Sequence, residues 1–215
     1  MNSGTTPLKD QFTSLDQQYE TSKLGMWVFL VTEILFFGGL FAGYALYRTL
    51  YPEAFGLANA HLDVFLGATN TVVLITSSLT MALAVNEARQ GKKAGTVRFL
   101  ALTILLGLVF LGVKFYEYHV KFVEHLVPGR TFSFPEYPGP GAQLFFSFYF
   151  AMTGLHALHM IVGIVLLTLL AHSAACGKFS AAYNTPVDMT GLYWHFVDIV
   201  WIFLFPLLYL IGRHG

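Results

Sequence analysis

Five carboxylate and histidine side chains occur inside long apolar segments of this sequence. They are Glu33, His156, His159, His195 and Asp198. His156 and His159 are three residues apart, and so are His195 and Asp198. Each of these two pairs would therefore share one face of a helix. A charged side chain at bilayer depth costs about 2.5 to 3.5 kcal/mol on insertion scales. Each of these residues therefore needs a partner or a function, and all five are expected at similar depth, where they could form one network.

Three interpretations of this set fit the residue types. Carboxylates and histidines can hydrogen-bond between neighbouring helices and so stabilise a bundle. The same groups can exchange protons at depth, as a proton relay or a proton-coupled transporter requires. Histidines can also be axial ligands of a haem, as in a haem-bearing membrane anchor, although two histidines at this spacing are a weak signal. The residues alone leave these interpretations open, although the paired repeats typical of transporters are absent from the sequence.

Other polar side chains interrupt the apolar segments at helical spacing. Lys114 and Glu117 are three residues apart and are expected to pair. A run of hydroxyl and amide side chains occupies one segment, at Asn70, Thr71, Thr76, Ser77, Ser78 and Thr80. Gly39 and Gly43 form a G-x-x-x-G pair, which predicts close contact between two helices. Trp194 is expected near a membrane interface, where indole is favoured, and Trp201 in the core.

The elements that carry these residues are predicted from composition and length. Hydrophobic residues make up 55% of the 215 residues and charged residues only 11%, against about 25% charged in soluble chains. Five apolar stretches reach the roughly 20 residues that span a bilayer as a helix, at about 24–47, 64–85, 97–117, 143–171 and 189–211. The predicted fold is an all-α integral membrane protein, a bundle of five transmembrane helices over residues 24–215.

The charges indicate the orientation of this bundle and exclude other classes. Residues 1–23 form a polar tail that does not resemble a secretory signal. Seven basic residues would lie on one side, Lys9, Lys23, Arg89, Lys92, Lys93, Arg98 and Lys178, and four on the other, Arg48, Lys121, Arg130 and Arg213. The larger set predicts a cytoplasmic amino terminus and an outer carboxy terminus. Equal numbers of basic and acidic residues, 12 each, do not suggest nucleic acid. The single cysteine, Cys176, excludes a disulfide framework.

Four segments resemble, in order, the helices of subunit III of the haem-copper respiratory oxidases. The strongest is YWHFVDIVWIFLFPLLYLIG at 193–212, and FYFAMTGLHALHMIVG at 148–163 resembles the family's T-G-x-H-x-L-H helix. LGMWVFLVTEILFFGGLFAGY at 24–44 resembles the helix with an intramembrane glutamate, and NTVVLITSSLTMALA at 70–84 the helix that follows it. The resemblance covers nearly the whole chain beyond the polar tail and implies the five-helix bacterial form.

The resemblance implies a subunit without a redox centre of its own. Haem and copper would reside in subunit I and, where present, dinuclear copper in subunit II. The complex would reduce oxygen to water and pump protons in the bacterial plasma membrane. This chain would pack against subunit I, contact subunit II and possible small subunits, hold phospholipids, and support oxygen entry and proton uptake. A related subunit of a nitric oxide reductase system is the alternative within the same fold.

The resemblance also transfers roles to individual residues. Glu33 matches the family's buried glutamate, and Glu117 matches a glutamate near a helix end. The remaining motif positions are His156, His159, Trp194, His195, Asp198 and Trp201. Many members place a basic residue at the cytoplasmic end of the fourth span, where a lipid phosphate binds. The sequence there is LLAHSAACGK, so His172 or Lys178 would have to take that role. The electron donor, cytochrome c or quinol, is not determined by this chain.

Overall fold

A computed structural model describes residues 8, 9 and 11–211, and these residues are almost entirely helical. The elements are α1 (Leu15–Leu50), α2 (Pro52–Ala60), α3 (Val64–Arg89), α4 (Lys93–Val123), α5 (Pro140–Ala175), α6 (Thr185–Phe205) and the π-helical turn η1 (Pro206–Leu210). Five of the described helices, α1, α3, α4, α5 and α6 with η1, are long and apolar enough to cross a membrane. The predicted all-α class is confirmed, as is the predicted number of helices long and apolar enough to span a membrane. Residues 1–7 and 10 of the predicted tail, and Arg213, lie outside the described residues.

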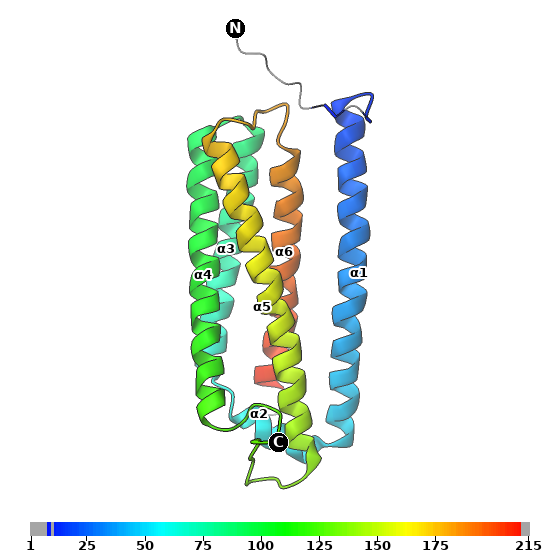
Figure 1. The fold of residues 1–215 in the computed structure, drawn as a ribbon, viewed down its shortest axis with the longest axis vertical. Coiled ribbons are helices and arrows are strands. Elements are labelled where there is room, and N and C mark those ends of the chain that lie inside the picture. The colour runs from blue at the N-terminus through cyan, green and yellow to red at the C-terminus, as the bar shows by residue number, and fades with distance from the viewer. Residues whose placement is uncertain (1–7, 10, 212–215) are drawn as a thin grey trace.

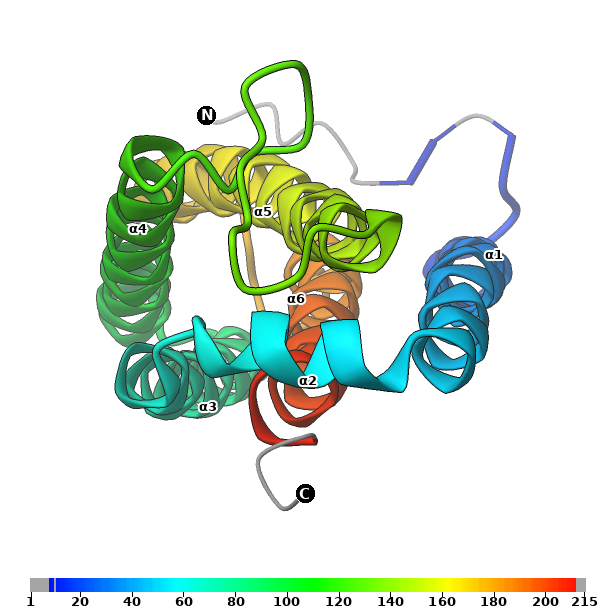
Figure 2. The ribbon, with the colours of Figure 1, turned by 90° about the horizontal axis from the view of Figure 1, so that it is seen from below.

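The long helices form a bundle around α6 (Figure 1). More than half of the apolar segment of α6 is buried, against 11% for α1. Seen from the α2 end, α6 lies between α3, α5 and α1, while α2 crosses beneath the bundle from α1 to α3 (Figure 2). The α3–α4 turn and the α5–α6 connection lie at the end where α1 begins, called here the amino-terminal end. Helix α1 is therefore a peripheral helix, and α6 is the most deeply buried of the described long helices.

Several helices extend beyond the apolar stretches. Helix α1 begins at Leu15, so residues 15–23 of the predicted polar tail are helical. Ser14 caps this start because its Oγ accepts a hydrogen bond from the Gln17 N–H, and Asp16 lies in the favoured first turn. The short helix α2, which begins with Pro52, was not predicted. Hydropathy predicts only the apolar segment that lies within the bilayer. The helix itself can extend beyond that segment, because its ends are set by capping and by backbone hydrogen bonds.

Glycines make room for large side chains, and they do so at only one member of the predicted G-x-x-x-G pair. Nothing lies within 4 Å of the position that a Cβ of Gly39 would occupy, so the predicted close contact is wrong there, whereas a Cβ of Gly43 would lie 3.3 Å from the Phe148 ring of α5. Closer approaches occur at Gly107 and Gly163, where a Cβ would lie 2.9 and 2.8 Å from ring atoms of Trp194. Trp194 is completely buried. The expectation that it lies at an interface is wrong, because these two glycines open a space for the indole inside the bundle.

Hydrogen bonds from the hydroxyl run join α3 to α6. The indole N–H groups of Trp194 and Trp201 donate to Ser77 Oγ at 2.9 Å and to Thr71 Oγ1 at 3.0 Å. The expected core position of Trp201 is confirmed, since it is fully buried. A third bond of 2.7 Å joins Ser78 Oγ to His195 Nδ1. The hydroxyl side chains that the sequence placed in one span thus lie on the side of α3 that contacts α6. Their hydrogen bonds fix the register of these two antiparallel helices.

A buried ion pair fastens η1 to the bundle. Lys114 Nζ lies 2.9 Å from Glu117 Oε2, as the spacing predicted, and both side chains are less than 5% exposed. Lys114 also donates to Tyr209 Oη at 2.9 Å and to Tyr149 Oη at 3.3 Å. Tyr209 Oη in turn donates to Glu117 Oε1 at 2.6 Å. The π-helical turn after Pro206 presents Tyr209 to this cluster, so the cluster connects α4, α5 and η1.

Replacing one member of the pair is expected to destabilise the bundle strongly. Lys114→Met leaves Glu117 buried without its cation, and breaking such a pair typically costs about 3–5 kcal/mol. The variant should unfold at a clearly lower temperature in detergent, measured by circular dichroism at helical wavelengths. The double variant Lys114→Met/Glu117→Gln should recover part of the loss. Lys23→Met, which removes an exposed lysine from α1, is the control. Equal melting of Lys114→Met and wild type would contradict the role of the pair.

Candidate functional site

Glu33 and His159 meet at membrane depth between α1 and α5. Glu33 Oε2 lies 3.2 Å from His159 Nε2, and the two side chains are 20% and 17% exposed. The other ring nitrogen, Nδ1, is 2.8 Å from the Leu155 carbonyl oxygen one turn earlier in α5. The sequence indicated both side chains as candidates. The structure adds that they form a pair, which connects the peripheral helix α1 to the bundle.

The hydrogen bonds of His159 determine how many protons the pair holds. A carbonyl oxygen only accepts, so Nδ1 carries a proton and donates it to Leu155. Nε2 then either accepts a proton held by the Glu33 carboxyl group or donates its own to the carboxylate. In both arrangements the pair is neutral overall and shares one exchangeable proton. A neutral pair suits a low-dielectric position, and the shared proton gives it the chemistry of a proton donor and acceptor.

The pair lies in an apolar groove bounded by α1, α5 and α6. The groove has a volume of about 330 Å³, and the residues that line it are Met26, Phe29, Glu33, Leu158, His159, Val162, Leu166, Thr190 and Tyr193. Tyr193 stacks on the His159 ring, with ring centroids 6.4 Å apart, and its hydroxyl donates to the His159 carbonyl at 3.0 Å. Sequence analysis missed Tyr193 as a site residue, although it directly precedes the Trp194–His195 motif.

His156 does not join this pair, although it precedes His159 by three residues. It is 1% exposed, and its ring packs against Phe110 and Trp201. Its Nε2 has no hydrogen-bond partner among the described residues. His156 faces the core between α4 and α6, while His159 faces α1. The two positions are about 60° apart around the helix axis, and their rings contact different neighbours.

His195 and Asp198 are also separate from the Glu33–His159 pair. His195 bonds to Ser78 of α3. Asp198 is 2% exposed, and neither carboxylate oxygen has a hydrogen-bond partner among the described residues. The predicted single network of carboxylates and histidines is therefore wrong. Glu33 lies on α1, and the other four residues lie on different sides of α5 and α6. Within the described residues, no group of three or more His, Cys, Asp or Glu side chains is arranged to hold a metal ion.

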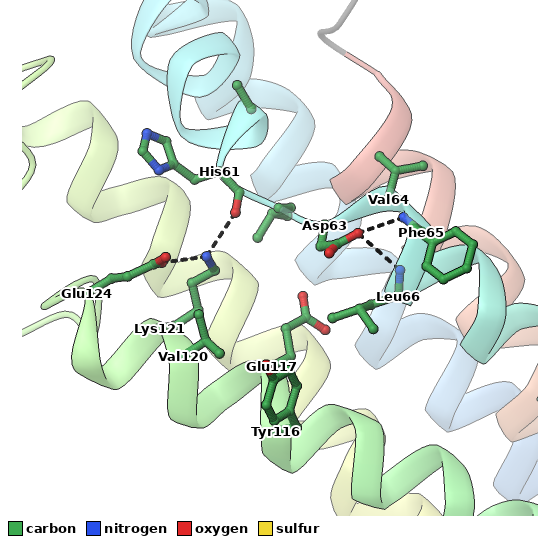
Figure 3. Close-up of a pocket in the computed structure, with 12 residues that line it drawn as sticks. His61, Asp63, Val64, Phe65, Leu66, Tyr116, Glu117, Val120, Lys121 and Glu124 are labelled. Carbon is green, nitrogen blue, oxygen red and sulfur yellow. Dashed lines mark hydrogen bonds and ion pairs between the residues drawn. The ribbon is translucent and has the colours of Figure 1, made fainter.

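The α2 end contains a polar cavity that reaches Glu117. The cavity has a volume of about 600 Å³ and lies between the α2–α3 turn and the last turns of α4 (Figure 3). Lys121 is 4% exposed and donates to the His61 carbonyl at 2.8 Å and to Glu124 at 2.6 Å (Figure 3). Asp63 caps α3 by accepting from the Phe65 and Leu66 N–H groups. Lys121, counted above as an orientation charge, is thus a structural residue, as its spacing to Glu124 could have indicated.

The proposed lipid residues lie at the amino-terminal end. His172 is in the last turn of α5, and Lys178 follows in the α5–α6 connection. Both are exposed. Each is therefore accessible to a headgroup, and neither contributes to the core.

Comparisons with known proteins agree with this architecture. A family model described as "Cytochrome c oxidase subunit III" matches residues 13–213. Cytochrome c oxidase subunit 3 of Thermostichus vulcanus is 35% identical over 88% of this chain and 87% of its own length. Cytochrome bo(3) ubiquinol oxidase subunit 3 of Pseudomonas putida is 33% identical over 88% of this chain and 85% of its own length. Quinol oxidase subunit 3 of Bacillus subtilis is 31% identical over 94% of both chains. The chain therefore belongs to the cytochrome c oxidase subunit III family.

Proposed function

We propose that this chain is the non-catalytic subunit III of a proton-pumping haem-copper terminal oxidase, and that it supports proton uptake and oxygen access. The observation that carries the proposal is the Glu33–His159 pair in its apolar groove. Haem and copper reside in the partner subunits, of which subunit I is the main contact and subunit II a further one. The relatives are oxidase subunits, so a nitric oxide reductase subunit and a haem-bearing anchor are not favoured.

The proton role follows from the single proton that the pair shares. A group that moves a proton at depth must change its protonation without leaving a lone charge in hydrocarbon. The Glu33–His159 pair does this, because a proton that moves between the two side chains leaves the pair neutral. Both side chains are partly exposed, so the pair is not sealed inside the bundle. The pair supports uptake in the neighbouring subunit and does not replace the catalytic subunit's own path.

The oxygen and lipid roles follow from the shape and lining of the groove. Molecular oxygen is apolar and favours hydrocarbon over water, so an apolar groove at membrane depth concentrates it. Phospholipid tails fit the same surface, which is lined mainly by Met26, Phe29, Leu158, Val162 and Leu166. A headgroup would lie at the amino-terminal end, near His172 and Lys178. In a bacterial plasma membrane this end would face the cytoplasm, as the basic residues predict.

Glu33→Gln tests the proton role. The amide keeps a hydrogen bond to His159 but cannot release a proton. The whole oxidase should assemble with normal haem content, and its oxygen consumption should fall several-fold relative to wild type at high pH, where protons are scarce, but little at low pH. Glu20→Gln, the same change at an exposed position of α1, should leave the profile unchanged. An intact Glu33→Gln complex with the wild-type pH profile would eliminate the relay and leave Glu33 with a structural role.

Cysteine accessibility tests the orientation. In a Cys176→Ser background, cysteines replace Gln90 in the α3–α4 turn and Arg130 in the α4–α5 connection, which are both exposed. A membrane-impermeant maleimide added to whole cells should label position 130 and not position 90. Inside-out vesicles should give the opposite pattern. Labelling of position 90 alone from outside would reverse the orientation.

The headgroup site is tested by counting bound lipids. The double variant His172→Ala/Lys178→Ala should lose about one anionic phospholipid from the purified complex in native mass spectrometry. The variant removes the Lys178 charge, worth roughly 1 kcal/mol near an anionic surface, and the hydrogen-bonding ring of His172. Lys23→Ala, which removes a basic residue from α1, should retain the wild-type number. An unchanged count in the double variant would show that the headgroup is held elsewhere.

A further inference from the structure

One side of α6 is left uncovered by the helices of this chain. It lies between α3 and α1 and carries no other long helix (Figure 2). Residues on this side of α6 include Ile199 and Phe203, which are 50% and 60% exposed. His195 belongs to the same side and is only partly buried. The central helix of the bundle thus presents an imidazole toward the exterior at membrane depth, about ten residues from either end of α6.

In the part of the chain that the structure describes, only one ring nitrogen of His195 has a hydrogen-bond partner. Its Nδ1 bonds to Ser78 Oγ at 2.7 Å. The described residues provide no hydrogen bond to the other ring nitrogen, Nε2. Lipid tails cannot provide one either, and ionisable residues in membrane spans almost always face protein or a water-filled cavity. The exposed side of His195 is therefore a surface that requires a polar partner from outside this chain.

The surroundings of His195 are shaped for a helix. A groove of about 280 Å³ runs between α3 and α6, and small residues, Ala82 and Gly191, contribute to its lining. At Gly191 a Cβ would lie 2.9 Å from Val85, so the two helices are close together and the groove is shallow. At the amino-terminal end the groove is closed by Arg89, whose guanidinium bonds to both carboxylate oxygens of Asp188 at 3.2 and 3.1 Å. Small residues beside a polar group are typical of contacts between transmembrane helices.

We infer that this surface, made of Ser78, Ala82, Val85, Gly191, Leu192 and His195 and called the α3–α6 face, binds a transmembrane helix of another oxidase subunit. That helix places a hydrogen-bonding side chain against His195 Nε2 and packs its backbone along Ala82 and Gly191. A phospholipid does not fit this face, because its tails leave the imidazole unsatisfied. The inference depends on the proposed function, since the partner belongs to the oxidase complex.

Site-specific photo-cross-linking in the intact complex tests this inference. A photoreactive amino acid at Ala82, which is exposed, should form a covalent adduct with another oxidase subunit. The same probe at Leu169, which is 61% exposed on α5, should react with lipid only. Reaction of position 82 only with lipid, or with a second copy of this chain, would overturn the inference. Absence of oxidase subunits from the wild-type preparation would instead contradict the proposed function.

Substitution of His195 separates hydrogen bonding from packing. His195→Leu should reduce retention of this subunit in the detergent-washed complex several-fold, and His195→Gln, which keeps a side-chain donor and acceptor, should restore most of it. The isolated variants should melt within a few degrees of one another. Thr168→Leu, which removes an exposed hydroxyl bonded only within α5, should not affect retention. Equal retention of His195→Leu and wild type would contradict the inference.

Discussion

Hydrocarbon provides no hydrogen bonds, so the polar groups that this chain places at membrane depth have to be satisfied by protein. The strongest case is the Lys114–Glu117 pair, which is surrounded by the hydroxyls of Tyr149 and Tyr209. The ammonium group also lies 5.1 Å from the centroid of the Trp201 ring. An uncompensated charge here would cost several kcal/mol. This requirement holds η1 against α4 and α5, and with it the end of the central helix.

The same requirement explains how α6 is fixed against α3. The indole N–H groups of Trp194 and Trp201 each find a hydroxyl on α3, and the large rings fill space that Gly107 and Gly163 leave open. A sliding movement of one helix by a single turn would separate both indole N–H groups from these acceptors inside the membrane. The polar contacts thus select one register of α3 and α6. In that register the indole rings pack densely against the glycines.

Two polar sites at membrane depth support the proposed functions. Glu33 and His159 satisfy each other by sharing a proton at the edge of an apolar groove. Among the described residues, His195 has a hydrogen-bond partner for only one of its two ring nitrogens, and the ring is partly exposed. These two sites lie on different sides of α6, one toward α5 and one toward α3. The proposals therefore assign two distinct surfaces at membrane depth, one to small apolar molecules and lipid tails, and one to a neighbouring helix.

The sequence by itself determined the class, the number of spans and the Lys114–Glu117 pair, because apolar length and spacing along a helix are local properties. It also determined which polar residues lie at membrane depth, and its ordered motifs indicated the family. Only the tertiary structure decided that Glu33 pairs with His159, that His156 faces the core, and that Trp194 is buried between two glycines. Those outcomes depend on the rotation of each helix about its axis and on which helix becomes its neighbour. Both are set by contacts between residues far apart in the sequence, such as Glu33 with His159, and no local pattern encodes them.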